Sequence, residues 1–347
     1  MKRKYGLLLA GTIIIICIVT GYRVWNTLDP DYTCAQCHSI APSHRSWVSS
    51  AHAGVHCTEC HGTATSEGFR SLTEKSGMIL THFSGEKNPE DIRLNETQVL
   101  DVAARCVQCH QAEHAGWLAS GHAVNYREIF MDAKHNAMEK PYSDCLRCHG
   151  MFYAGNISDL MSLEGEPSSW AIKHIKQEKR SAIPCLVCHQ IHTENPVSMR
   201  YVSSMDSSKM ARNPRTALYM RADKMHIRSD MLTPVWMKDN GLPVNRAIDH
   251  NTLLCQQCHA PDYVHTAGSQ DDRTPVGVHE GISCTACHKV HSGDTHESCL
   301  QCHSEVSANC KLDVRTMNTT YLSNDSPNDI HRINCTSCHA ERRKIVY

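Results

Sequence analysis

Large aromatic side chains are scarce in this sequence. The 347 residues include only four Phe and five Trp, and aromatic residues make up 6% of the chain. The apolar share of 41% looks ordinary, but it includes 20 cysteines. A chain of this length normally buries a sizeable core, and large apolar side chains fill most of such a core. We therefore expect a group other than protein to fill part of the interior.

Excess charge of either sign is also lacking. The chain has 35 Lys plus Arg and 36 Asp plus Glu, for a formal net charge of −1. Proteins that bind nucleic acid need basic surface to neutralise phosphates, and acidic partners are attracted in the same way. The composition gives no reason to expect nucleic acid as a partner.

Charge is absent from one long run near the N-terminus. Basic residues 2–4 precede 18 uncharged residues, 5–22, and Arg23 ends the run. As a helix this run is about 27 Å long, close to the hydrocarbon thickness of a bilayer. No small-residue cleavage site follows it, and basic residues favour the cytoplasmic side. We predict that residues 1–26 are a single-pass anchor in the cytoplasmic (inner) membrane, with the rest facing the periplasm or cell exterior. A cleaved signal peptide is the alternative.

Most of the cysteines belong to one repeated motif, Cys-x-x-Cys-His. Nine copies, numbered motif 1 to motif 9 in chain order, contain 18 of the 20 cysteines, and only Cys17 and Cys310 lie outside them. The motif cysteines are Cys34, Cys37, Cys57, Cys60, Cys106, Cys109, Cys145, Cys148, Cys185, Cys188, Cys255, Cys258, Cys284, Cys287, Cys299, Cys302, Cys335 and Cys338. The motif histidines are His38, His61, His110, His149, His189, His259, His288, His303 and His339.

The spacing of this motif has a chemical reason. Two thiols three positions apart on a helical turn reach the two vinyl groups of one haem, and the next residue places an imidazole under the iron. Zinc sites use Cys-x-x-Cys pairs but need no histidine after each pair, and disulfides do not explain the histidine either. We predict nine covalently bound haem c groups (iron), and hence a multihaem c-type cytochrome. Nine haems in one chain of this size must touch, and a touching row conducts electrons.

The remaining 16 histidines are numerous enough to give every iron a second ligand. A low-spin electron-transfer haem usually takes a second His or Met. One repeat, His-x-x-Trp-x-x-Ser-x-His-Ala, occurs at residues 44–53 and 114–123, and we expect it to be helical, with the second histidine one turn on. Another, His-x-Gly-(Val/Ile)-x-Cys-Thr-x-Cys-His, occurs at 52–61 and 279–288, with a shorter version at 331–339.

Two histidines lie three positions beyond a motif histidine, where binding the same iron is difficult and a neighbouring haem is the better target. They are His192 and His291. The predicted second ligands are His52, His114, His122, His192, His250, His279, His291 and His331, with His44, His135 and His296 as further candidates. We expect the remainder to be packing or surface residues, namely His56, His82, His174, His226 and His265.

The predicted fold is mainly α with much coil, packed around haems, with little sheet. Motifs 7 and 8 are so close in sequence that their haems should pack together. The interval from His189 to Cys255 has no motif but holds seven of the 14 methionines. We expect the methionines of this interval either to be axial ligands or to fill gaps against the flat haem rings.

The part before about residue 150 resembles the membrane-anchored tetrahaem quinol dehydrogenases of the NapC/NirT family. The resemblance lies in the order of an anchor helix, motif 1 and the stretch Ser50 to His61. It implies a tetrahaem domain at 27–150, followed by a pentahaem domain at 151–347 with a haem-free insert at about 190–254. The family often has a Met ligand two positions after the first motif histidine, where this chain has Ile40.

The resemblance implies a relay from membrane quinol, menaquinol in particular, to a periplasmic or membrane-complex redox protein. Quinol oxidation releases protons, for which Glu59, Glu74, Lys75 and His82 are candidates. The alternative is a terminal reductase for nitrite, hydroxylamine or a sulfur oxyanion, since the later part weakly resembles octahaem cytochromes related to hydroxylamine oxidoreductase. Related nitrite reductases hold their catalytic haem with Cys-x-x-Cys-Lys, which none of the nine motifs has. A subunit of a larger respiratory complex is a third possibility.

Overall fold

The computed structural model describes residues 2–63, 75–77, 79–80, 82–84, 94–189, 192, 250–259, 273–291, 296–303, 316–323 and 325–338. Of these residues, 57% are helical and much of the rest is coil. The strands found in this part of the chain are two residues long each, β1 (Met161–Ser162) and β2 (Ala171–Ile172), which pair antiparallel. The predicted mainly helical fold with much coil is confirmed, whereas the haem-packed interior stays a prediction.

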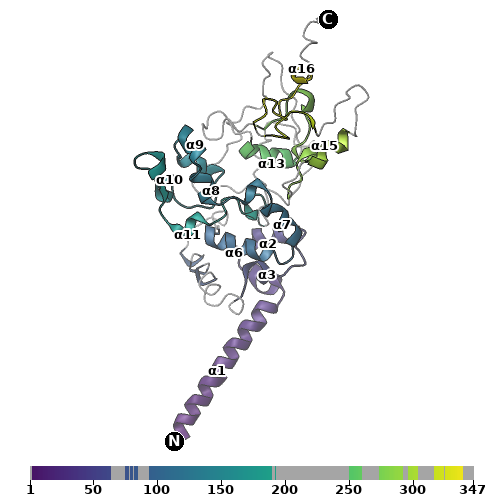
Figure 1. Cartoon of the computed structure of the whole chain (residues 1–347). Coiled ribbons are helices and arrows are strands. Elements are labelled where there is room, and N and C mark those ends of the chain that lie inside the picture. Colours follow the sequence, from purple (N-terminus) through teal and green to yellow (C-terminus); the bar gives the residue numbers. More distant parts are fainter. Residues whose placement is uncertain are drawn as a thin grey trace. The chain divides into compact units, whose positions relative to one another are not determined.

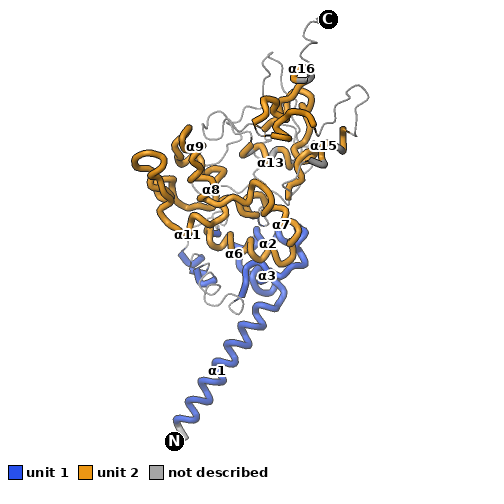
Figure 2. Tube along the Cα trace, viewed as in Figure 1, with its two compact units in different colours: residues 1–94, 191–194 blue, residues 95–190, 195–347 orange. Residues whose placement is uncertain are grey.

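The chain forms two compact units (Figure 2). Unit 1 comprises residues 1–94 and 191–194, and unit 2 comprises 95–190 and 195–347. Motifs 1 and 2 therefore belong to unit 1 and motifs 3 to 9 to unit 2. The boundary expected near residue 150 does not coincide with this division and stays a prediction about family relationship. Most of the expected insert at 190–254 lies outside the described residues.

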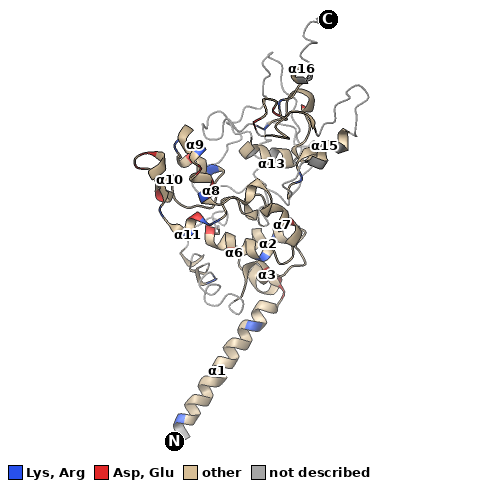
Figure 3. Cartoon of the chain, in the orientation of Figure 1, with Lys and Arg blue, Asp and Glu red and all other residues tan. Residues whose placement is uncertain are grey.

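Unit 1 begins with one long helix, α1 (Figure 1). Its apolar side chains are exposed, and a long uncharged stretch separates Lys4 from Arg23 (Figure 3). The segment Lys4–Thr27 is long and apolar enough to cross a membrane, although a signal sequence has the same properties. After α1 (Lys2–Thr27), the described part of unit 1 contains η1 (Pro30–Tyr32), η2 (Cys34–Gln36), α2 (Ala41–Val48) and α3 (Cys57–His61). Residues 75–77, 79–80 and 82–83 are helical as well.

Unit 2 consists of short helices joined by turns. Before the segment 193–249 its elements are α6 (Glu96–Cys106), α7 (Gln111–Leu118), η4 (Gly121–Ala123), α8 (Tyr126–Phe130), α9 (Ala133–Met138), η5 (Ser143–Arg147), α10 (Ile157–Leu160), β1, η6 (Pro167–Ser169), β2, α11 (Ile175–Glu178) and η7 (Cys185–Val187). After that segment they are α13 (His250–His259), η9 (Gly277–His279), α14 (Cys284–Cys287), α15 (His296–Cys302) and α16 (Cys335–Cys338).

A small apolar core lies in the first part of unit 2. Tyr126, Phe130, Leu146, Leu160 and Met161 are its most buried large side chains, each at most 2% exposed. Leu146 lies between the two cysteines of motif 4, so this motif is built into the core. Motif 4 is thus part of the core packing.

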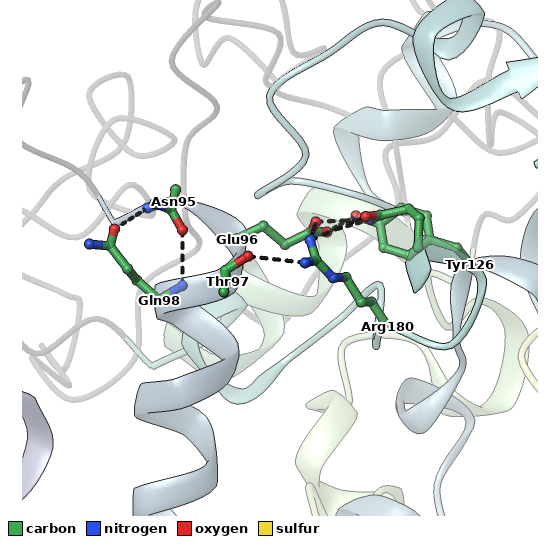
Figure 4. A network of polar contacts seen from close by, with 7 residues as sticks. Asn95, Glu96, Thr97, Gln98, Tyr126 and Arg180 are labelled. Carbon is green, nitrogen blue, oxygen red and sulfur yellow. Dashed lines mark hydrogen bonds and ion pairs between the residues drawn. The ribbon is translucent and has the colours of Figure 1, made fainter. Parts of the chain in front are cut away.

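A buried carboxylate fixes the start of α6, the helix that ends in motif 3 (Figure 4). Glu96 accepts hydrogen bonds from the Tyr126 hydroxyl at 2.5 Å, from Gln177 Nε2 at 2.9 Å and from Arg180 Nη1 at 2.7 Å. Asn95 caps the helix in a reciprocal box with Gln98. A buried charge is tolerated only when paired and hydrogen-bonded, and here the same contacts tie α6 to α8 and to the segment after α11.

Candidate functional site

The motifs share one local geometry, a single helical turn. In motifs 3, 4, 5, 7 and 8 the backbone N–H of the histidine donates to the carbonyl of the first cysteine, at 2.7–3.0 Å. Residues three and four apart in such a turn lie on one side. The turn therefore presents two thiols and one imidazole together, which is the arrangement that thioether attachment and axial ligation of one haem require.

The second sequence repeat is a repeated helix cap. In motifs 2, 7 and 9 the residue before the first cysteine accepts the backbone N–H of the threonine after it, at 3.3, 3.3 and 3.0 Å respectively. These capping residues are His56, Ser283 and Asn334. The caps satisfy a backbone N–H of the first turn, so they start the motif turn at the same position each time. His56, expected to have a packing role, uses its other ring nitrogen on the Leu28 carbonyl at 2.8 Å.

The first sequence repeat also has the same structure twice. A short helix, α2 or α7, carries the first histidine and the tryptophan, whose rings lie 5.3 Å apart in one copy and 5.7 Å in the other. The serine hydroxyl then donates to the tryptophan carbonyl at 2.7 Å in both copies. The serine hydroxyl oxygen also accepts the backbone N–H of the second histidine, at 3.0 and 3.2 Å.

These serine turns correct one prediction. We expected the second histidine to lie one turn further along the same helix, but α2 ends at Val48 and α7 at Leu118. The serine side chain competes with the backbone for hydrogen bonds, as Ser often does at helix ends. His52 and His122 therefore lie beyond the helices that carry His44 and His114.

Six motif histidines lie beside a histidine from outside the motifs, and each pair is contained in one unit. The ring centroids are 4.9 Å apart for His38–His82, 5.9 Å for His61–His192, 6.0 Å for His259–His122, 5.8 Å for His189–His291, 6.0 Å for His288–His331 and 6.3 Å for His303–His279. A metal–imidazole bond is about 2 Å long, so two imidazoles on opposite sides of one metal have centroids about 6 Å apart. Five of the six pairs have this spacing.

The pairing follows the rule expected for the two histidines that closely follow a motif. His192 lies beside His61 of motif 2 and not beside His189, its neighbour in sequence. His291 lies beside His189 of motif 5 and not beside His288. The repeat histidines behave alike, because His279 precedes motif 7 but lies beside motif 8. Each of these pairs therefore joins two segments of the chain.

One member of these pairs was missed. We expected His82 to be a packing or surface residue, but its ring lies beside His38, and its Nδ1 is 3.1 Å from the Ser39 hydroxyl. A signal was present, since His82 is the only histidine between motif 2 and motif 3. The pair is tighter than the others, so its rings must separate by about 1 Å to bind one metal.

The other predicted ligands have contacts of other kinds, or they lie outside the described residues. His44 is largely buried, with Nε2 3.0 Å from an Asp31 carboxylate oxygen but without hydrogen-bond geometry. His114 lies against Trp117, and the backbone of His52 is held by its serine turn. The side chains of His250 and His296, and all of His226, His265 and His339, lie outside the described residues. His135 lies in α9, where its backbone N–H donates to the side chain of the N-cap residue Asp132.

Burial favours the neutral form of three of the paired rings. It lowers the pKa of His122, with a further effect from His259, and it lowers the pKa of His192 beside His61. Burial and then His331 lower the pKa of His288. A lowered histidine pKa keeps the ring neutral at pH 7, which is the form that binds a metal.

Thiols of different motifs also lie together. A hydrogen bond with Cys57 lowers the pKa of Cys34 to about 5, so motifs 1 and 2 meet in unit 1. A hydrogen bond with Cys148, followed by burial, raises the pKa of Cys258 well above its usual range, so motifs 4 and 6 meet in unit 2. Burial and then Cys299 raise the pKa of Cys287. Since α14 also packs against α15, motifs 7 and 8 lie side by side, and the packing of their haems stays a prediction.

Backbone contacts connect further motifs within unit 2. The Thr252 hydroxyl in α13 accepts the backbone N–H of Cys284 at 3.1 Å, which joins motif 6 to motif 7. Val276 and Val278 donate to the carbonyls of His331 and Ile333, which brings the approach to motif 7 beside the approach to motif 9. Motif 3 at the end of α6 packs against η7 of motif 5.

Zinc sites and disulfides are the alternatives to haem attachment for the cysteines, and neither arrangement is present among the described residues. There, no group of three or more His, Cys, Asp or Glu side chains is arranged to hold a metal ion. The described cysteines form no disulfide bond. What the described residues offer are opposed histidine pairs beside cysteine turns.

Comparison with known proteins adds no relative. No family model, no curated protein and no solved structure matches this chain.

Proposed function

We propose that the chain is a nonahaem c-type cytochrome, anchored by α1, that relays electrons from membrane quinol to a periplasmic or membrane-complex redox partner. The observation that carries the proposal is the set of six pairs in which a motif histidine lies beside a histidine from another segment. Such pairs, next to a turn with two thiols, are typical of covalently attached haem with two histidine ligands.

Within this proposal the chain's own residues have separate tasks. The two thiols of each motif would form the thioether bonds to the haem, and the motif histidine would be one ligand of its iron. The paired histidine would be the second ligand and, because it comes from another segment, would join distant parts of the chain. Haem held in this way supplies reversible one-electron exchange at its iron.

The same pairs favour a relay over a terminal reductase. A reductase needs an iron with one coordination position open to its substrate, whereas a paired histidine fills that position. Six of the eight motif histidines that the structure describes have such a neighbour. The close approach of motifs within each unit also supports a relay, because the cysteine turns of different motifs lie next to one another.

The quinol end of the relay is proposed for unit 1. Here α1 leads directly to motif 1, and the resemblance of this part to the NapC/NirT family supports quinol as the donor. A group must accept the protons that quinol oxidation releases. Glu59 on α3 and Lys75 are the described candidates, and Glu74 lies outside the described residues. His82, the fourth candidate, has the role of an iron ligand in this proposal because its ring lies beside His38.

Stopped-flow reduction tests the proposal. The full chain is placed in lipid discs, mixed with a menaquinol analogue, and followed through haem absorbance, with dithionite giving the total reducible haem. We expect quinol to reduce most of the haem that dithionite reduces. No reduction by quinol, with full reduction by dithionite, would contradict a quinol-fed relay.

A second addition separates the relay from the reductase. Nitrite, hydroxylamine or a sulfur oxyanion is added in turn to the reduced chain, and the haem spectrum is followed. The relay predicts no rapid reoxidation by any of them. Rapid reoxidation with product formation would instead establish a terminal reductase.

A further inference from the structure

A short apolar surface in unit 1 has no assigned role. Ile79, Leu80 and Phe83 are 57%, 69% and 80% exposed. The described residues around them, 75–77, 79–80 and 82–83, are helical, and Ser84 donates its backbone N–H to the Leu80 carbonyl at 3.0 Å. Residues three and four apart on a helix share a face. The three apolar side chains therefore form one exposed face, called here the 79–83 face.

Polar contacts attach this segment at both ends. At its start, Lys75 Nζ donates to Asn26 Oδ1 at 3.0 Å and lies 5.8 Å from the centre of the Tyr22 ring. At its end, His82 Nδ1 is 3.1 Å from the hydroxyl of Ser39. The segment is thus fixed to the last turns of α1 on one side and to motif 1 on the other.

We propose that the 79–83 face lies in the interfacial layer of the membrane, as a second membrane contact of unit 1 beside the anchor. The inference rests on the membrane anchoring in the proposed function. It is carried by continuity, because the segment is tied to the end of α1, where the exposed apolar surface of a candidate membrane span stops.

The chemistry of the neighbouring side chains fits a lipid surface. Trp25 and Tyr32 are 53% and 74% exposed and flank the end of α1. Tryptophan and tyrosine are enriched at the level of lipid headgroups, and an amphipathic helix buries its apolar face at that level while basic residues stay near the headgroups. The contact would hold His38 and His82 close to the interface, where a quinol headgroup arrives.

Lipid photolabelling tests this contact on the full chain. The chain is placed in discs that contain a phosphatidylcholine with a photoreactive group, and labelled residues are identified by mass spectrometry. Met138 and Ile175, each 75% exposed in unit 2, are matched controls for apolar exposure. We expect label on Ile79, Leu80 and Phe83 at more than about five times the level on the controls. Label on α1 alone would overturn the proposal.

Hydrogen exchange provides a second readout that needs no labelling chemistry. The variant Ile79→Ser/Leu80→Ser/Phe83→Ser is compared with Met138→Ser/Ile175→Ser, both in discs. We expect the first variant to lose backbone protection at residues 75–84 while α1 stays protected, and the second to keep it. Equal protection in both variants would also overturn the proposal, as would crosslinks between two copies through this face. Neither readout depends on electron transfer, so failure of quinol oxidation would leave both unchanged.

Discussion

The earlier and the later segment of unit 2 are held together by different kinds of contact. Residues 95–189 carry three motifs and bury fourteen of the apolar side chains that the structure describes as core. Residues 250–338 carry the turns of four motifs, yet among their described residues only Leu254 and Ile333 are buried apolar side chains. The earlier segment thus contains its own core, whereas the later segment is connected mainly by backbone and side-chain hydrogen bonds.

If the motifs bind haem as proposed, this difference indicates where haem would matter most for folding. Burial of apolar side chains is the main stabilising contribution in a folded protein. A segment with little of it needs apolar surface from elsewhere, and nine haems would provide such surface. We infer that the later segment depends on its haems for structure, while the earlier segment uses its own side chains as well.

The largest expected effect comes from removing haem attachment in each segment. Cys284→Ala/Cys287→Ala in motif 7 should lower the mass by one haem and raise deuterium uptake throughout residues 273–338. The matched variant Cys145→Ala/Cys148→Ala in motif 4 should raise uptake mainly near its own turn, because the core around Tyr126 persists. Intact-mass measurement and hydrogen exchange check both. Equally local effects in the two variants would remove the distinction between the segments.

A smaller effect is expected from breaking the polar network of the earlier segment. Glu96→Ala leaves Tyr126, Gln177 and Arg180 without their shared acceptor. The loss of a paired, largely buried carboxylate should reduce the free energy of unfolding by about 2–4 kcal/mol. Denaturant unfolding followed by circular dichroism measures it.

The pair Arg127–Glu178, in which Arg127 lies largely in solvent and Glu178 is partly buried, is the matched control for that variant. Arg127 is 63% exposed and its Nη1 lies 3.0 Å from the Glu178 carboxylate. Surface pairs of this kind contribute about 0–1 kcal/mol, so Glu178→Gln should have little effect. A similar loss in both variants would mean that Glu96 is not a special anchor of α6.

The smallest effect concerns a helix cap in the later segment. Ser283→Ala removes the side-chain oxygen that accepts the Thr285 backbone N–H, which should destabilise α14 by about 1 kcal/mol. The Ser283 hydroxyl also lies 3.1 Å from the Thr252 hydroxyl in α13, so a change in residues 250–259 is expected from that contact alone. If the later segment has little stability of its own, hydrogen exchange should detect the change further away, in residues 325–338 as well. A change limited to α14 and α13 would indicate that the later segment is more stable than its few buried side chains suggest.

The sequence predicts the local parts of the candidate site well, because they depend on neighbours in the chain. The motif turns follow from the spacing of Cys and His. The prediction that His192 and His291 do not pair with the histidine of their own motif follows from their separation of three residues. The partner of each histidine could not be predicted, because it depends on contacts between distant segments. His82 was overlooked for this reason, since nothing in its immediate sequence resembles the repeats that mark His122 or His279.

The sequence predicted that the elements would be short helices, but it did not predict where each helix ends. Short helices with much coil were expected, but the ends of α2 and α7 were not, because a serine hydroxyl diverts the backbone there. The division into two units after Leu94 also has no clear mark in the sequence. It depends on which motifs meet in space, as Cys34 and Cys57 do in unit 1.

The central claim is that a motif histidine and its partner from another segment bind the same iron. Low-temperature electron paramagnetic resonance of the oxidised full chain tests it most directly, with His291→Ala compared against His174→Ala, a variant of an exposed histidine outside the pairs. The claim predicts that His291→Ala converts one low-spin iron to a high-spin iron, while His174→Ala leaves the spectrum unchanged. A His291→Ala spectrum identical to that of the unmodified chain would contradict it.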